Sequence, residues 1–384
     1  MHTLHWGDRM KQWISALLLC AMVFCFPHAV CAAEAPETGA EAMVLYCVEN
    51  GSIILSKNKD REMRPASTTK LMTTLLTLEE AAKNDRVVTF TQEMTAEGSS
   101  MYLKLGEQVR LSDLAAGMMM CSGNDAANAA AIALSGSEKR FANLMNTRAK
   151  QLGMEHTHFV TPSGLDDDDH YSTAYDMALL MQAGLQNADF ADLTYQKTKT
   201  VRFVQPSDKS VTYSNHNRLL RSYADCIGGK TGYTTAAGRC LVSAARRGSL
   251  TLICVTLNDK TDWEDHMALY DYGFSKLRGY YSGDSSFCLK VPCVGSEQAT
   301  TAVIGAEDVS LVLEGAAADE VKRTVFLDPF VYAPVRAGEQ LGRIDYTLDG
   351  EMLKSVSLVA AEDVQEKPFK KNIFQKIKEF FTYG

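Results

Sequence analysis

The 384-residue chain lacks the signatures of several common classes of protein. It contains no Gly-x-Ser-x-Gly elbow, which argues against an α/β-hydrolase. His156 and His158 hint at a metal site, but no carboxylate motif accompanies them and the cysteines do not have the spacing of a zinc knuckle. No basic face is visible in a chain of net charge −8, so nucleic acid is not an expected partner. Internal repeats and low-complexity tracts are also missing.

The composition is that of a folded, globular protein. Apolar residues make up 46% of the chain and charged residues 22%, which excludes wholesale disorder. Folded domains typically contain about 100–200 residues. We therefore expect two domains, the larger of which can bury a substantial core.

The first 33 residues have the pattern of a secretory signal peptide. Arg9 and Lys11 form a short basic region, an apolar run covers 13–26, and small residues at 30–33 offer cleavage sites. The apolar run is shorter than the roughly 20 residues that span a bilayer. We expect residues 1–33 to be a cleaved signal peptide, with a retained N-terminal anchor as the alternative, and residues 34–41 to be a linker.

Seven of the ten cysteines lie beyond residue 33, an odd number that cannot all form disulfides within the chain. Most of them are expected to be small, buried apolar residues. Cys288 and Cys293 are the only close pair and therefore the one candidate for a disulfide.

Residues 42–276 contain both strand and helix patterns. Two apolar, β-branched runs, Met43–Val48 and Ser52–Ser56, are joined at Asn50-Gly51, which predicts a hairpin. From Gly228 onward the pattern is again that of strands, with a second hairpin at Arg247-Gly248. Helical patterns between the hairpins cover 65–82, 111–120, 124–134 and 176–185. Strands at both ends and helices between them predict an α+β domain with an antiparallel sheet.

The pattern changes near residue 284, where long helical patterns end and short β-rich runs recur. Examples are Ser310–Glu314, Val321–Leu327 and Ser355–Ala360, with Asp349-Gly350 as a hairpin turn. Residues 284–364 are therefore predicted to form a small all-β domain.

A candidate nucleophile lies at the start of the first predicted helix. Ser67 and Lys70 are three residues apart, so their side chains lie on one face of the helix and can meet. A serine needs a base, and a desolvated lysine near other cations can act as that base at neutral pH. The N-terminus of the helix adds backbone N–H groups that stabilise developing negative charge.

Ser-x-x-Lys alone is weak evidence, because about one or two matches are expected by chance in a chain of this length. Ser56 and Lys59 form a second match, which is interpreted as part of a surface hairpin. Two tripeptides make the assignment specific: Ser122-Gly123-Asn124, between two predicted helices, and Lys230-Thr231-Gly232, which enters a strand. Each tripeptide is expected only ~0.1 times by chance.

Together these motifs resemble those of the low-molecular-weight penicillin-binding proteins with D-Ala-D-Ala carboxypeptidase activity. The wider matches are 65–73 (PASTTKLMT), 122–127 (SGNDAA) and 170–174 (HYSTA). The resemblance is specific from residue 42 to 274 and looser over the β-rich region and the tail. It implies a penicillin-binding transpeptidase/β-lactamase-like domain, with an antiparallel sheet flanked by helices, followed by a small all-β domain.

The resemblance implies catalytic roles for three residues. Ser67 would be the acylated nucleophile, Lys70 its general base, and Ser122 the group that relays a proton to the leaving D-alanine. The implied reaction removes the terminal D-alanine from peptidoglycan stem peptides through an acyl-enzyme, without a cofactor or a metal. β-Lactams should acylate the same serine because they imitate the D-Ala-D-Ala terminus.

The resemblance assigns the other motif residues to substrate binding. Asn124 would hydrogen-bond the substrate peptide, and Lys230 and Thr231 would meet its terminal carboxylate. Gly232 completes the strand motif, and the backbone N–H of Tyr233 would form the oxyanion hole together with that of Ser67. Many relatives have histidine where this chain has Tyr233, a change that keeps the backbone donor but leaves substrate preference open.

Two other functions fit part of the pattern. A serine β-lactamase shares the architecture, but the Glu-x-x-Leu-Asn motif that one major class uses for deacylation is missing from the sequence. A protein that only binds wall peptides without catalysis is the second alternative, and the three intact motifs argue against it.

The last 18 residues carry a charge opposite to that of the preceding chain. Residues 367–384 contain five lysines and one glutamate, whereas residues 34–366 have a net charge of −13. On a helical wheel, six apolar side chains share one broad face: Phe369, Ile373, Phe374, Ile377, Phe380 and Phe381. This pattern predicts an amphipathic helix that binds anionic lipid headgroups without spanning the bilayer, with a soluble packing helix as the alternative. The protein is therefore expected at the outer face of the cytoplasmic membrane, as a peripheral protein.

Overall fold

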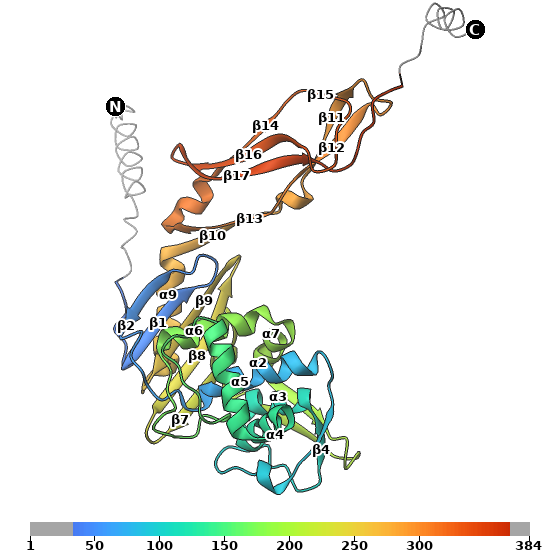
Figure 1. Ribbon diagram of the computed structural model, residues 1–384. Helices are drawn as coiled ribbons and strands as arrows, with labels where there is room; N and C mark the ends of the chain where they lie inside the picture. The colour runs from blue at the N-terminus through green and yellow to red at the C-terminus, as the bar shows by residue number, and fades with distance from the viewer. Residues whose placement is uncertain (1–33, 369–384) are drawn as a thin grey trace, which may run out of the picture. The chain divides into compact units, whose positions relative to one another are not determined.

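A five-stranded antiparallel sheet lies at the centre of the first folded region (Figure 1). The computed structural model describes residues 34–368. The strand order is β2-β1-β9-β8-β7, so β7 is an edge strand. Both predicted hairpins are confirmed, since β1 pairs with β2 and β8 pairs with β9. The strands are β1 (Ala42–Cys47), β2 (Ile53–Lys57), β7 (Cys226–Thr234), β8 (Gly238–Arg247) and β9 (Leu250–Leu257).

The sheet separates two hydrophobic cores, because successive side chains along a strand point to opposite faces. Val44 and Tyr46 of β1 face the larger core, which contains side chains of most of the helices that precede β7. Met43 and Leu45 face a smaller core with α9 (Asp262–Lys276). Because both faces are covered, the central strand β9 is buried at every position.

Helices are the main regular elements of the chain between β2 and β7, as the sequence predicts. They are η1 (Ala66–Thr69), α2 (Lys70–Ala81), η2 (Gln92–Met94), α3 (Leu111–Met120), α4 (Asn124–Ser135), α5 (Glu138–Gln151), α6 (Ala174–Gln186), α7 (Ala188–Tyr195) and α8 (Leu219–Ser222). Two short antiparallel ribbons lie among them: β3 (Val87–Thr89) with β4 (Gln108–Arg110), and β5 (Thr198–Arg202) with β6 (Ser210–Ser214).

Helix α9 corrects the expectation that only strands follow residue 228. Its first turn contains Asp262, Glu264 and Asp265, an acidic cluster that favours a helix N-terminus. Leu269 and Tyr270 pack against the sheet, while the opposite side of the helix is polar. Helices α5, α7 and α8 were likewise not predicted.

The C-terminal part of the described chain is all-β apart from short 3-10 turns. A six-stranded sheet has the order β14-β16-β17-β12-β11-β15, and β10 pairs separately with β13. The predicted turn at Asp349-Gly350 joins β16 to β17, and both residues have positive φ. The elements are β10 (Leu277–Ser282), η3 (Asp284–Ser286), β11 (Cys288–Val294), β12 (Thr300–Gly305), β13 (Val309–Glu314), η4 (Gly315–Glu320), β14 (Lys322–Leu327), β15 (Val331–Tyr332), β16 (Gln340–Leu348) and β17 (Glu351–Ala360).

The candidate disulfide between Cys288 and Cys293 is not formed, which corrects that expectation. The two residues are five positions apart on β11, so their side chains point to opposite faces, with Cys288 exposed and Cys293 buried. All seven cysteines within residues 34–368 are free thiols, and five of them are buried, as expected.

No helix within residues 34–368 is both long and apolar enough to span a bilayer. The predicted signal peptide, residues 1–33, lies outside the described residues, as do residues 369–384 of the predicted anchor helix.

Candidate active site

Ser67 lies on a tight turn that leads into α2. The 3-10 turn η1 begins after Pro65, and Ala66 has a φ of +48°, which is uncommon for a residue with a Cβ. Thr68 Oγ1 donates a hydrogen bond of 2.6 Å to the Pro65 carbonyl oxygen and so stabilises the turn. Ser67 is therefore held at the junction between the turn and the helix.

Lys70 is the first residue of α2 and is fully buried. Its Nζ donates to Ser67 Oγ at 2.8 Å and to the carbonyl oxygen of Ser163 at 2.7 Å. The structure thus brings the two predicted side chains into direct contact. The contribution of Ser163 was not predicted, because a backbone carbonyl leaves no trace in the residue type.

The Lys70 amine lies in an environment that favours its neutral form. Burial, and after it the nearby Lys230, holds the pKa of Lys70 well below its usual value, while Cys121 and Asp125 act in the opposite direction. A neutral amine can accept a proton from the hydroxyl that it contacts. Lys70 is therefore equipped to act as a base toward Ser67.

Ser122 forms a second pair with a buried amine. It lies in the turn between α3 and α4 with a φ of +59°, and Lys230 Nζ from β7 donates to its Oγ at 3.0 Å. The same amine donates to the Thr231 carbonyl oxygen at 2.7 Å. Burial lowers the pKa of Lys230 to about 7, so this amine changes charge near neutral pH.

Strand β7 passes close beside Ser67 at Gly232. A Cβ at this position would lie 3.0 Å from the Pro65 carbonyl oxygen and 3.1 Å from the Ser67 nitrogen. Glycine therefore lets the strand come this near to the turn that carries Ser67 without displacing its backbone. The next residue, Tyr233, has a side chain that is 66% exposed.

Asn124 is buried at the start of α4. Its Nδ2 donates to the Glu97 carbonyl oxygen at 2.6 Å, whereas its Oδ1 has no hydrogen-bond partner among the residues that the structure describes. A buried acceptor without a donor costs about 1–3 kcal/mol. An N–H group of a ligand that reached this oxygen would remove that cost.

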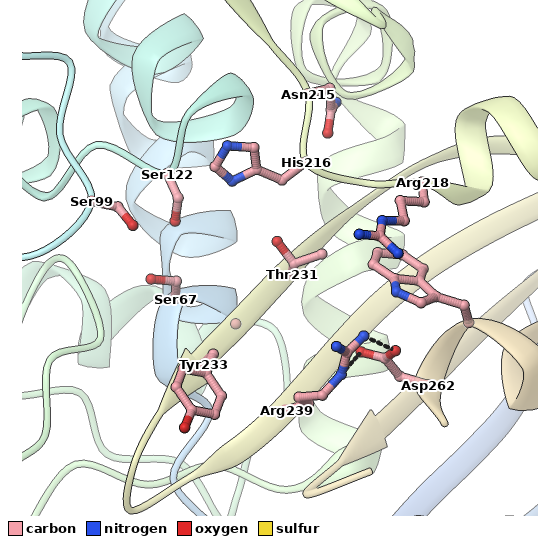
Figure 2. Close-up of a pocket in the computed structure, with 12 residues that line it drawn as sticks. Ser67, Ser99, Ser122, Asn215, His216, Arg218, Thr231, Tyr233, Arg239 and Asp262 are labelled. Carbon is pink, nitrogen blue, oxygen red and sulfur yellow. Dashed lines mark hydrogen bonds and ion pairs between the residues drawn. The ribbon is translucent and has the colours of Figure 1, made fainter. Parts of the chain in front are cut away.

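These residues surround a pocket of about 740 Å³. Five predicted residues line it, whereas Lys70, Asn124 and Lys230 are buried. Figure 2 shows Ser67, Ser99 and Ser122 together at one end, and Arg218, Arg239 and Asp262 at the other. The five predicted lining residues are Ser67, Ser122, Thr231, Gly232 and Tyr233.

Several lining residues were not predicted from the sequence. Arg239 of β8 donates from Nε to Asp262 of α9 at 3.2 Å, and this ion pair forms part of the pocket wall. No sequence spacing links two residues that are brought together only by packing of a helix on a strand. The others that were missed are Ser99, Asn215, His216, Arg218 and Trp263.

The arrangement can supply the groups that acyl transfer needs. A hydroxyl contacts a buried amine of lowered pKa, and a second hydroxyl with its own amine lies at the same end of the pocket. Within residues 34–368, no group of three or more His, Cys, Asp or Glu side chains could hold a metal ion. Fold and site together have the features of a serine hydrolase.

Comparison with known proteins identifies the family. Residues 29–261 match the family described as D-alanyl-D-alanine carboxypeptidase, and residues 278–366 match the C-terminal domain of penicillin-binding protein 5. The chain belongs to the D-alanyl-D-alanine carboxypeptidase family, as the resemblance of its motifs had indicated.

Individual relatives extend over nearly the whole chain. D-alanyl-D-alanine carboxypeptidase DacF of Bacillus subtilis is 31% identical over 94% of this chain and 96% of its own length. DacA of Escherichia coli K12 is 29% identical over 100% of this chain and 99% of its own. Among solved structures, penicillin-binding protein 5 of Haemophilus influenzae covers 87% of this chain and 100% of its own, with 28% identity and a TM-score of 0.64.

Proposed function

We propose that Ser67 is the nucleophile with which this serine D-Ala-D-Ala carboxypeptidase removes the terminal D-alanine of peptidoglycan stem peptides. Its Oγ attacks the carbonyl carbon of the penultimate D-alanine while neutral Lys70 takes the hydroxyl proton. The bond to the terminal nitrogen then breaks, that nitrogen takes the proton of the Ser122 hydroxyl, and Ser122 is reprotonated by the Lys230 ammonium that contacts it. The products of this step are free D-alanine and an ester on Ser67.

Water completes the reaction in a second step. Its oxygen bonds to the ester carbonyl carbon and passes a proton to the neutral Lys230 amine. The bond to Ser67 Oγ breaks, and that oxygen takes back the proton held by Lys70. The shortened peptide leaves as a carboxylate, and the lysines return to their starting charge. No atom or electron from a cofactor is needed in either step.

The pocket also suits binding of the substrate terminus. The positive charge of Lys230 and the Thr231 hydroxyl would meet the terminal carboxylate, and the free Asn124 Oδ1 would accept a peptide N–H. The backbone N–H groups of Ser67 and Tyr233 would form the oxyanion hole. The close approach of β7 at Gly232 supports this last assignment, because it brings the edge strand beside the nucleophile.

One observation carries the proposal: the 2.8 Å contact between the fully buried Lys70 amine and Ser67 Oγ. It supplies a nucleophile together with a base that is held neutral. The family match does not favour either alternative, a serine β-lactamase or a non-catalytic wall-peptide-binding protein.

The function can be tested on the full-length protein with two substrates. We expect release of D-alanine from a stem pentapeptide that ends in D-Ala-D-Ala, and a long-lived covalent adduct with fluorescent penicillin. Rapid, repeated hydrolysis of penicillin without release of D-alanine would instead indicate a β-lactamase. Binding of the pentapeptide without release of D-alanine would indicate a non-catalytic binding protein.

We further propose that the enzyme is exported and is held at the outer face of the cytoplasmic membrane. The sequence patterns of 1–33 and 367–384 support this, as a signal peptide and an amphipathic anchor helix. The catalytic domain would comprise residues 42–276. The β-rich domain, residues 284–364, would act as a spacer or a surface for partners.

Deletion of residues 367–384 should release the enzyme from membranes, because it removes the apolar face and the net charge of +4. Co-sedimentation with vesicles that contain phosphatidylglycerol would measure the loss. D-alanine release should be retained as a control, since every proposed site residue lies within 42–276. Unchanged sedimentation of the truncated protein would contradict the anchor.

A further inference from the structure

A buried histidine outside the three motifs connects the catalytic helix to the loop that contacts Lys70. His170 is only 2% exposed. Its Nε2 lies 2.9 Å from the hydroxyl oxygen of Thr69, the residue before Lys70. Its Nδ1 accepts the backbone N–H groups of Val160 at 3.0 Å and of Thr161 at 3.2 Å.

These contacts fix the tautomer of the ring. Backbone N–H groups can only donate, so Nδ1 must carry a lone pair and no proton. The proton of the neutral ring is therefore on Nε2, which donates to Thr69 Oγ1. His170 thus joins two parts of the chain through three hydrogen bonds that are all satisfied only in the neutral state.

The segment that His170 holds is the one that contacts α2. The Pro162 carbonyl oxygen accepts from Thr73 Oγ1 at 2.6 Å, and the Ser163 carbonyl oxygen accepts from Lys70 Nζ at 2.7 Å. Gly164 packs so closely on the nucleophile turn that a Cβ there would lie 1.9 Å from the Ala66 carbonyl oxygen. Displacement of this segment would therefore move the partner of Lys70 and open the amine to water.

We propose that His170 is a positioning residue for Lys70: by anchoring residues 160–164 to Thr69, it holds the Ser163 carbonyl against the lysine amine and keeps water away from it. This inference rests on the catalytic role proposed above for Lys70. His170 itself touches neither Ser67 nor the pocket.

Some of the charged groups around His170 raise its pKa and others lower it. Burial lowers the pKa of His170 to about 4, with His158 and Lys70 acting in the same direction and Asp167 opposing them. Protonation would also place a hydrogen on Nδ1, against the two N–H groups that it accepts. The ring therefore stays neutral over the pH range in which Lys70 must work.

The test compares full-length His170→Ala with the exposed histidine variant His156→Ala as a control. We expect His170→Ala to acylate with fluorescent penicillin about 10- to 100-fold more slowly, since small misplacements of catalytic groups have effects of this size. The acidic limb of its pH profile should move to higher pH, because burial is the main cause of the lowered Lys70 pKa and water would now enter. His156→Ala should keep both the rate and the profile.

A second pair of variants covers the case in which His170→Ala fails to fold. Thr69→Val removes the acceptor of the Nε2–H but keeps the shape of the side chain, whereas Thr69→Ser retains the hydroxyl. We expect the valine variant to acylate more slowly, with the acidic limb of its pH profile at higher pH. The serine variant should behave as wild type. Normal rates and profiles in His170→Ala and Thr69→Val would overturn the inference.

A readout independent of activity separates this inference from the proposed function. NMR of ε-¹³C-labelled lysine should show a higher pKa for Lys70 in Thr69→Val or His170→Ala than in wild type. If wild type released no D-alanine but this shift occurred, the proposed function would fail and the positioning role would stand. An unchanged Lys70 pKa beside normal D-alanine release would reject the positioning role alone.

Discussion

Replacement of Ser67 by alanine should abolish D-alanine release and covalent labelling by penicillin. The loss in kcat should be on the order of 10⁴-fold or more, because no ester can form and the base Lys70 loses the hydroxyl that it contacts. A coupled assay for D-alanine would measure the rate, and mass spectrometry of the intact protein would measure the adduct. The pocket should still bind the peptide, since the other lining side chains are retained.

The chain offers a matched control for this variant. Ser56 and Lys59 form the second Ser-x-x-Lys match, and Ser56 is exposed on β2 while Lys59 pairs with Asp60. Ser56→Ala should therefore keep full activity and full labelling. A penicillin adduct on Ser67→Ala at the wild-type rate would place the nucleophile elsewhere.

Replacement of Lys70 by methionine should slow acylation by about 10³-fold, the size of effect typical for loss of a general base. Methionine has a similar length and no amine, so the fully buried site stays filled. Stopped-flow acylation with penicillin would measure the rate. A wild-type rate in this variant would mean that another group deprotonates Ser67.

The pH profile provides a second measurement for the same variant. Wild-type kcat/KM should rise with pH as Lys70 loses its proton, and fall above neutral pH as Lys230, whose pKa burial lowers to about 7, loses the charge that attracts the substrate carboxylate. Lys70→Met should lose the rising limb and keep the falling one. Loss of both limbs would show that the two lysines do not act separately.

Lys70→Met should be more stable than wild type although it is less active. The pKa of Lys70 is lower in the folded state than the value of 10.5 expected for the unfolded chain, so between these values the unfolded chain binds more protons. The free energy of unfolding of wild type therefore falls as pH is lowered through this range. Lys70→Met does not lose stability in this way. It should therefore unfold at a higher temperature than wild type at neutral pH, as calorimetry would show.

Local patterns in the sequence were sufficient for much of the fold. The hairpins at Asn50-Gly51 and Arg247-Gly248 follow from turn residues between β-branched runs, and α3 begins and ends where its apolar pattern does. The α+β region and the all-β region that follows it were both predicted. Ser67 and Lys70 are three residues apart across the 3-10 turn η1, where residues at this spacing also lie on one face, so their contact too could be derived locally.

Features that depend on tertiary contacts could not be derived in this way. Helix α9 was missed because only one narrow face of it is apolar, which gives a weak helical pattern in the sequence. The role of that face becomes clear from its packing against the sheet. The Ser163 carbonyl and the Arg239–Asp262 pair reach the site through backbone position or through packing between distant segments. Closeness in sequence can also mislead. Cys288 and Cys293 are near each other in the chain but face opposite sides of β11, so they form no disulfide.

The contact at Gly232 bears on where the specificity of this chain can change. The gap between the edge strand and the serine turn is bordered by main-chain atoms of Pro65, Ser67 and Thr68, so a side chain at position 232 would press directly on the backbone that carries Ser67. Preference for one peptide over another can be altered farther out, where side chains such as Tyr233, Arg218 and Trp263 border the cavity. We therefore expect changes of specificity in this chain to come from these peripheral side chains, where a substitution leaves the backbone beside Ser67 in place.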